Sequence, residues 1–261
     1  MDKPDTTRIN TVPKLFWYNV ENYRDDVTMW RKHRGVWEAH TWGNYGNWSR
    51  DIGHALIAEG LKSGDKISIL SETRMEWVIL DMAIMGIGCI TAPVYPSNTE
   101  EQVKYIVKHS ESKVVFAEDQ EQLDKMLVIW KDLPLVKKVV VIDKYYPRDL
   151  PNVITLNDYR EFGKTHRSNN PGKFEERLAS VEPEDIISFT YTSGTTGYPK
   201  AGMFNSHNVI SVAKHLPDML PTDRSDLGIS YLPLSHIAER LLGHFIKLYS
   251  GYVTVFADSM E

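Results

Sequence analysis

The sequence has only one cysteine, Cys89, among its 261 residues. One cysteine excludes an internal disulfide framework and a zinc site built from several cysteines. Positive charge is not in excess either, because 30 Lys and Arg against 35 Asp and Glu give a formal net charge of −5. A chain with this balance lacks the basic surface that nucleic-acid binders carry. We therefore expect no nucleic-acid partner, and any phosphate must be held locally by a loop.

Uninterrupted apolar segments are also few. The most apolar stretch, residues 77–94, approaches the length of a membrane-spanning helix, but it includes Asp81 and Pro93. We interpret it as a buried helix that leads into a strand. Residues 1–10 are polar and hold no apolar core of the length that a signal peptide needs. We therefore expect a cytoplasmic protein.

What the sequence does contain is an alternation of helix-like and strand-like segments. Leu123, Met126, Leu127 and Trp130 recur at the spacing of one face of a helix. Helices are expected at residues 48–58, 72–85, from 97 onward, 123–130, 208–215 and 235–249. Strands are expected at residues 66–70, 87–94, 114–117, 136–142, 186–191, 228–232 and 252–257. This order predicts an α/β fold of mostly parallel sheets with helices on both faces.

The alternation stops between residues 160 and 183. Residues 164–173 are polar and include Ser-Asn-Asn-Pro-Gly, a run typical of loops. We therefore predict an N-terminal lobe at residues 1–160 with the first sheet, a loop or linker at 161–183, and a second α/β lobe at 184–261. The last expected strand has no helix after it, so we expect the fold to be incomplete at its C-terminus and the sequence to be cut from a longer chain.

The most informative segment follows the strand expected at residues 186–191. It reads Tyr191-Thr192-Ser193-Gly194-Thr195-Thr196-Gly197-Tyr198-Pro199-Lys200. Glycines let a backbone turn tightly and aim its N–H groups inward. Hydroxyls can donate to phosphate oxygens or bind Mg²⁺, and a lysine adds a point charge. The segment predicts a loop that binds the polyphosphate of a nucleotide, and a flexible connecting loop without a ligand is the alternative.

The spacing excludes other nucleotide motifs. A Walker A loop needs G-x-x-x-x-G-K-[ST], whereas here Lys200 follows Gly197 by three and precedes Ala201. The sequence also lacks G-x-G-x-x-G and G-x-S-x-G, the motifs of dinucleotide-binding folds and of hydrolase nucleophile elbows.

Three segments resemble the adenylate-forming superfamily, which includes acyl-CoA synthetases, firefly luciferases and adenylation domains of nonribosomal peptide synthesis. Residues 191–200 resemble its phosphate-loop signature, and residues 231–240, Tyr-Leu-Pro-Leu-Ser-His-Ile-Ala-Glu-Arg, resemble its L-P-L-x-H segment. Residues 41–117, with Gly-Asp-Lys at 64–66, Glu-Trp at 76–77 and Ala-Pro-Val-Tyr-Pro-Ser at 92–97, are most similar to long-chain fatty acyl-CoA synthetases, including the bubblegum-type branch.

The resemblance implies the large N-terminal domain of such an enzyme. In that family a fatty acid attacks ATP to give an acyl-adenylate and pyrophosphate, and CoA then displaces AMP; Mg²⁺ assists. The residues that would hold the ATP phosphates are Thr192, Ser193, Gly194, Thr195, Thr196, Gly197 and Lys200, and Thr192 would also contact Mg²⁺. His236 would be catalytic and bind substrate by orienting the acyl carboxylate, with Glu239 beside it in the substrate site.

Each of these roles has a structural alternative. Lys200 could pin the loop to a carboxylate, His236 could cap a helix, and Glu239 with Arg240 could form a solvated face. The sequence also departs from the family, because Ala201 follows the signature lysine and His207 stands one position away from the usual histidine. We assign His207 no catalytic role.

Much of the family's site has no counterpart in these 261 residues. The adenine, ribose and CoA contacts and the C-terminal domain lie beyond Glu261, so we expect the chain to be inactive alone. The resemblance therefore predicts the N-terminal part of a long-chain fatty acid–CoA ligase, and the alternative is a non-catalytic module that binds a nucleotide or an acyl group. Long-chain acids partition into bilayers, which is compatible with peripheral membrane contact, although no basic amphipathic helix supports it.

Overall fold

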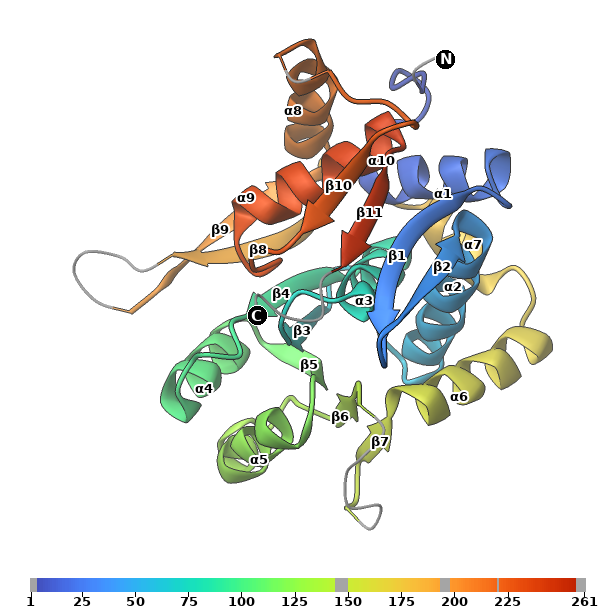
Figure 1. Ribbon diagram of the computed structural model, residues 1–261. Helices are drawn as coiled ribbons and strands as arrows, with labels where there is room; N and C mark the ends of the chain where they lie inside the picture. The colour runs from blue at the N-terminus through green and yellow to red at the C-terminus, as the bar shows by residue number, and fades with distance from the viewer. Residues whose placement is uncertain (1–3, 144–149, 193–197, 220, 257–261) are drawn as a thin grey trace.

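The computed structural model describes residues 4–143, 150–192, 198–219 and 221–256 and contains two sheets (Figure 1). The larger has seven strands in the order β7-β6-β5-β3-β4-β8-β9. Their bounds are β3 Lys66–Leu70, β4 Ile90–Val94, β5 Ser112–Ala117, β6 Lys138–Val141, β7 Val153–Thr155, β8 Ile186–Thr192 and β9 Lys200–Asn205. All neighbours pair in parallel except β8 and β9. The predicted, mostly parallel sheet is confirmed.

Strand side chains supply two separate cores because neighbouring residues point to opposite faces. On β5, Val114 and Phe116 belong to one core, while Val115 and Ala117 belong to the other. The first face is covered by α2 (Trp42–Ala58), α3 (Met75–Gly86) and α6 (Leu156–Asn169), and the second by α4 (Glu100–His109) and α5 (Gln120–Ile129). Helices therefore cover both faces, as predicted.

Helix α3 is buried along its whole length and leads through a short turn into β4. This confirms the interpretation of residues 77–94 as a buried helix followed by a strand. No helix within the described ranges is both long and apolar enough to cross a membrane.

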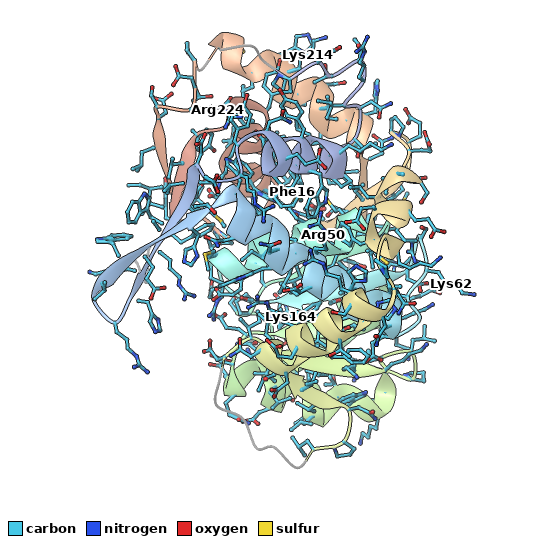
Figure 2. The ribbon with its side chains drawn as sticks, turned by 90° about the vertical axis from the view of Figure 1, so that its right-hand side faces the viewer. Phe16, Arg50, Lys62, Lys164, Lys214 and Arg224 are labelled. Carbon is cyan, nitrogen blue, oxygen red and sulfur yellow. The ribbon has the colours of Figure 1, made fainter. Side chains whose placement is uncertain are left out.

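The smaller sheet joins the two ends of the chain. Its strand order is β10-β11-β1-β2, with bounds β10 Leu227–Ser230, β11 Val253–Phe256, β1 Val27–His33 and β2 Val36–Thr41. Strand β1 pairs in parallel with β11 and antiparallel with β2. Helix α1 (Val12–Asn22) precedes this sheet, and Figure 2 shows Phe16 where α1 meets α2. The Phe16 ring lies 4.5 Å from that of Tyr45 and 6.2 Å from that of Trp42, centroid to centroid.

The loop expected at residues 161–183 is wrong. Helix α6 extends to Asn169, and α7 (Lys173–Ala179) follows after a turn in which Gly172 has a φ of +83°. Helix α6 lies so close to α2 that a Cβ on Gly163 would be 1.8 Å from the Asp51 carbonyl oxygen. Within α6 only Leu156, Tyr159 and Gly163 are buried, which leaves an apolar pattern too sparse to predict the helix.

The two sheets do not follow the predicted division of the chain at residues 160–184. Strands β8 and β9 extend the sheet that β3 begins, whereas β10 and β11 pair with the N-terminal β1. Pairing between distant strands depends on how the layers stack, and sequence order alone does not fix it.

Two helix boundaries also differ in detail. The helix expected from residue 97 begins after Thr99, whose hydroxyl accepts from Gln102 N while the Gln102 side chain accepts from Thr99 N at 2.9 Å. These reciprocal bonds satisfy two end groups of α4 and fix its start. The helix expected at residues 235–249 is a continuous helical run made of α9 (Ile237–Glu239), a π-helical turn (Arg240–Phe245) and α10 (Ile246–Ser250).

Candidate active site

The phosphate-loop motif closes a β-hairpin. Thr192 is the last residue of β8, Lys200 is the first of β9, and the two are register partners. Ser193, Gly194, Thr195, Thr196 and Gly197 lie outside the described residues. The helix expected at residues 208–215 is confirmed as α8 (Ser206–Met219), and strand β9, which was not predicted, lies between it and the motif. Most of β9 is exposed or half-buried, so its residues carry no continuous apolar pattern that predicts a strand.

The motif residues that end β8 and begin β9 are open to a ligand. Thr192 and Lys200 are exposed. In the part of the chain that the structure describes, no carboxylate forms an ion pair with Lys200. The interpretation that Lys200 pins the loop to a carboxylate therefore has no support there. A hydroxyl and an ammonium group held at neighbouring positions are suited to an anion with several oxygens.

The second motif runs past the carboxyl ends of β3 and β4. The Thr73 hydroxyl, just after β3, donates to the Leu232 carbonyl at 2.6 Å and accepts from Leu234 N at 2.8 Å. The Ser235 hydroxyl donates to the carbonyl of Val94, the last residue of β4, at 3.3 Å. Thr73 binds this segment without belonging to either motif, and nothing in the sequence pattern indicated it.

The two motifs meet at one edge of the larger sheet. Strand β4 pairs in parallel with β8 through Thr91 and Ser188, so Val94 and Tyr191 stand three residues further along neighbouring strands. Carboxyl ends of parallel strands lie at the same edge, where open α/β sheets bind their ligands. This edge of the sheet therefore carries Thr192 at the end of β8 and the segment that contains His236 beside the end of β4.

His236 occupies the first position of the helical run. Its Nδ1 accepts a hydrogen bond from Ala238 N at 3.1 Å, which is an N-terminal cap, so the structural interpretation of this histidine is confirmed. A ring nitrogen that accepts is unprotonated, so the neutral imidazole carries its proton on Nε2. The side chain is exposed, which leaves Nε2 accessible to a substrate.

Glu239 lies inside the protein, so its interpretation as part of a solvated face is wrong. Its side chain accepts from the Ser230 hydroxyl at 2.6 Å, and burial raises the pKa of the carboxyl group. A Cβ on Gly243, one turn further, would lie 2.3 Å from Glu239 Oε1. Only a glycine at 243 leaves room for this carboxylate.

Arg240 is buried too and forms an ion pair with Asp81 of α3. Its Nε lies 3.3 Å from Asp81 Oδ2, Nη2 contacts Oδ1, and Nη1 donates to the Ser188 hydroxyl of β8. Burial alone would raise the pKa of Asp81, but the Arg240 charge, together with His244 and the Thr91 hydroxyl, outweighs it, and the pKa lies below its ordinary value. Arg240 N also donates to the His236 carbonyl at 3.2 Å. The ion pair joins Arg240 and Asp81, which are 159 positions apart, so no local pattern could indicate it.

Residues 16–261 match the model of a protein family described as AMP-binding enzyme. The chain belongs to the AMP-binding enzyme family. Its curated relatives include a long-chain-fatty-acid–CoA ligase of Mus musculus, 29% identical over 97% of this chain and 35% of the relative. Another, from Mycobacterium tuberculosis, is 32% identical over 85% of this chain and 36% of the relative. This AMP-binding family member thus spans about a third of the length of these relatives.

Solved structures share the fold of this AMP-binding family member. A luciferase-like enzyme of the mealworm Zophobas morio superposes with a TM-score of 0.80 at 16% identity, over 100% of this chain and 57% of that one. An anthranilate CoA ligase in complex with anthranoyl-AMP superposes with a TM-score of 0.79 at 20% identity, over 94% and 44% of the two chains. The fold is that of the N-terminal large domain of adenylate-forming enzymes.

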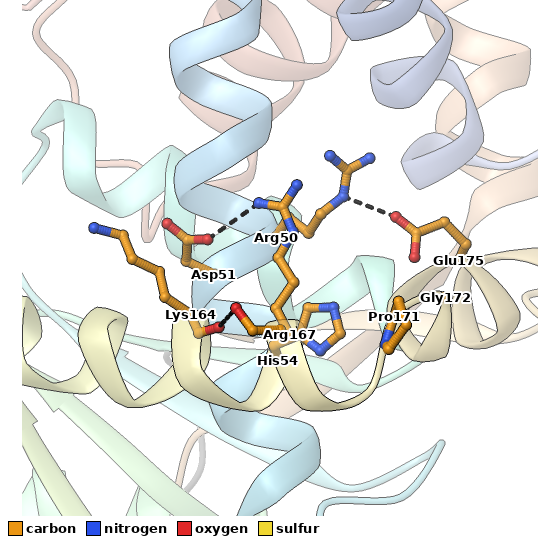
Figure 3. Close-up of a pocket in the computed structure, with 9 residues that line it drawn as sticks. Arg50, Asp51, His54, Lys164, Arg167, Pro171, Gly172 and Glu175 are labelled. Carbon is orange, nitrogen blue, oxygen red and sulfur yellow. Dashed lines mark hydrogen bonds and ion pairs between the residues drawn. The ribbon is translucent and has the colours of Figure 1, made fainter.

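A pocket of about 670 Å³ between α2 and α6 contains none of the motif residues (Figure 3). Its charges are largely paired: Arg50 Nε lies 2.8 Å from Glu175 Oε1, and Arg167 lies 3.4 Å from Asp51. His54, which also lines the pocket, faces His166 with 3.1 Å between the two Nδ1 atoms. We assign this pocket no part in the candidate site.

Proposed function

We propose that this protein takes part in the ATP-dependent ligation of a long-chain fatty acid to CoA. The observation that carries the proposal is the shared sheet edge, where exposed Thr192 and Lys200 are register partners and the His236 segment runs beside the next strand end. Family membership supports ATP as the nucleotide. The names of relatives that are 29% and 32% identical support a long-chain fatty acid as the acid and CoA as the thiol.

In the proposed reaction an acyl carboxylate oxygen attacks the α-phosphorus of ATP, and the bond to pyrophosphate breaks. The thiol of CoA then attacks the acyl carbonyl, and AMP leaves. Thr192 and Lys200 would bind the β- and γ-phosphates, together with Ser193, Gly194, Thr195, Thr196 and Gly197. The ammonium group of Lys200 would offset the charge that grows on departing pyrophosphate, where fixed charges contribute most.

His236 and Glu239 would serve the acyl substrate. The exposed Nε2 of His236 is suited to donate a hydrogen bond to the fatty-acid carboxylate and so hold it in line for attack. Glu239 would form part of the wall behind it, with its carboxylate fixed by Ser230. Both roles are proposals that rest on position and on the motif.

Mg²⁺ would supply charge neutralisation to the polyphosphate. Thr192 offers a single exposed hydroxyl, and the described residues hold no group of three or more His, Cys, Asp or Glu side chains placed for a metal ion. A lone hydroxyl fits an ion that arrives on the phosphates, because Mg²⁺ keeps phosphate oxygens and water as most of its ligands.

The test is exchange of labelled pyrophosphate into ATP by the full-length natural protein, with palmitate, octanoate and benzoate as separate acids. We expect exchange that depends on an acid and is strongest with palmitate, followed by thioester formation when CoA is added. The 261-residue chain alone is expected to give neither. A fatty acid that partitions into bilayers would bring the enzyme into peripheral contact with membranes, which vesicle sedimentation can measure.

Lack of exchange with every acid would contradict the ligase. Saturable binding of ATP or of an acyl group without exchange would instead support a non-catalytic binding module.

A further inference from the structure

Two side chains of α4, Tyr105 and His109, contact residues at both ends of the phosphate-loop motif. We infer that they are positioning residues that hold Thr192 and Lys200 in register for phosphate binding; this inference rests on the proposed function. We call Tyr105 and His109 the α4 pair. Neither residue belongs to a motif of the sequence.

The incoming end of the motif is held by His109. Its Nδ1 lies 3.0 Å from the Tyr191 hydroxyl, and the two rings meet edge to face at 5.8 Å between centroids. Tyr191 precedes Thr192 directly and is buried. Burial raises the pKa of Tyr191 to about 12, so its hydroxyl stays protonated and can donate to the imidazole.

The outgoing end is held by Tyr105. Its hydroxyl donates to the Pro199 carbonyl at 3.1 Å, and its ring stacks on that of Tyr198 with 4.7 Å between centroids and an interplanar angle of 18°. Tyr198 is 76% exposed, so this stack is a specific contact at the surface and not part of the core. Pro199 precedes Lys200 directly.

The two halves of the α4 pair support each other. Tyr105 and His109 are four residues apart on α4, which places them on one face, and their rings stack at 5.4 Å. Lys200 lines a pocket of about 440 Å³ together with both of them. Helix α4 itself is fixed by its capping bonds and by buried Val103, Ile106 and Val107.

Contacts with the α4 pair lower the entropic cost of ligand binding. A hairpin end that is already held in one arrangement loses less conformational freedom when it meets a ligand. Tyr105 carries no charge, so its contribution to phosphate binding must come from placement. Lys200, in contrast, contributes through its charge. Ionic strength distinguishes the contribution of Tyr105 from that of Lys200, because salt weakens charge attraction and leaves aromatic stacking largely unchanged.

The experiment measures the dissociation constant of inorganic pyrophosphate with Mg²⁺ by calorimetry on the 261-residue protein, at three salt concentrations. Tyr105→Ala is expected to weaken binding about 3- to 10-fold, the range that aromatic pairs contribute, with an unchanged salt dependence. Tyr105→Phe keeps the ring and should recover part of the loss. Lys200→Ala should weaken binding and flatten the salt dependence. Phe162→Ala removes a half-exposed aromatic ring from α6 and serves as the matched control, with wild-type binding.

The outcomes separate the two proposals. If wild-type protein does not bind pyrophosphate, or if Lys200→Ala binds as tightly as wild type, the phosphate role of the motif is overturned and the α4 pair loses its function with it. If Lys200→Ala weakens binding while folded Tyr105→Ala does not, only the α4 pair is overturned. Circular dichroism checks folding. If Tyr105→Ala is unfolded, Tyr105→Phe becomes the deciding variant. Pyrophosphate binding by Tyr105→Phe as tight as that of wild type then overturns the positioning role of the α4 pair.

Discussion

Thr192 and Lys200 stand directly opposite each other where β8 ends and β9 begins. Directly opposite residues in an antiparallel pair point to the same face, with Cβ atoms about 4.5–5.5 Å apart. One polyphosphate can therefore reach both side chains. The motif places its hydroxyl and its lysine eight positions apart in the chain, and the hairpin brings them together.

Removal of the lysine charge should impair the first half-reaction. Lys200→Ala is expected to lower acid-dependent exchange of pyrophosphate into ATP by the full-length protein about 10- to 100-fold, since hydrogen bonds to charged groups contribute about 1.5–3 kcal/mol. Lys214→Ala, which removes an exposed lysine from α8, is the matched control and should leave the rate unchanged. Equal rates in the two variants would contradict a role of Lys200 in phosphate binding.

Two variants separate the capping role of His236 from a role in chemistry. His236→Ala removes the cap and the imidazole, whereas His236→Asn restores a cap, because asparagine is among the preferred residues at this position. We expect urea denaturation to show a loss of about 1 kcal/mol for alanine and little for asparagine. Fatty-acid-dependent exchange should fall in both. Exchange at the wild-type rate in His236→Asn would reduce this histidine to a cap.

The ion pair between Asp81 and Arg240 should be costly to break and less costly to replace. Arg240→Met leaves the Asp81 carboxylate buried without its main partner, and we expect a loss of about 3–5 kcal/mol in the free energy of unfolding. The double variant Asp81→Leu with Arg240→Met removes both charges and should recover much of it.

Urea denaturation of both variants checks this expectation. Lys173→Met breaks an exposed pair with Glu176 and serves as the control, with little change expected. A double variant no more stable than Arg240→Met would contradict the explanation by an unpaired buried charge.

The environment of His54 predicts a loss of stability in mild acid. Burial, helped by the nearby His166, lowers the pKa of His54 from 6.5 to about 4. The folded protein therefore binds the proton less readily than the unfolded chain does. Stability from neutral His54 is complete above pH 6.5 and is lost as the pH falls from 6.5 to about 4.

The measurement is the urea midpoint at pH 7.0, 5.5 and 4.5. The midpoint of His54→Asn should fall less with pH than that of wild type. His33→Asn, at an exposed position on β1, should follow the wild-type curve. Parallel curves for wild type and His54→Asn would show that His54 does not carry the acid sensitivity.

Local patterns predicted the elements whose apolar residues are dense. Strand β3 was expected at residues 66–70 and is found at Lys66–Leu70, and the buried segment α3–β4 was recognised in spite of its length. Elements with few buried residues were missed. Helix α6 buries three of its fourteen residues, and β9 lies at the sheet edge. Helix α1, which buries seven of its 11 residues, and strands β1 and β2 were also not predicted, and sparse burial does not explain the omission of α1.

The sequence by itself determined the fold class and the family and indicated the residues of the candidate site, because those depend on residue types at short fixed spacings. Thr192, Lys200 and His236 were each identified within a contiguous motif. Only the tertiary structure decided that both motifs lie at one edge of the larger sheet and that Arg240 is buried against Asp81. It also decided that Tyr105 and His109 contact the β8–β9 hairpin. Those contacts join residues 82 to 159 positions apart, and they exist only once the layers have packed.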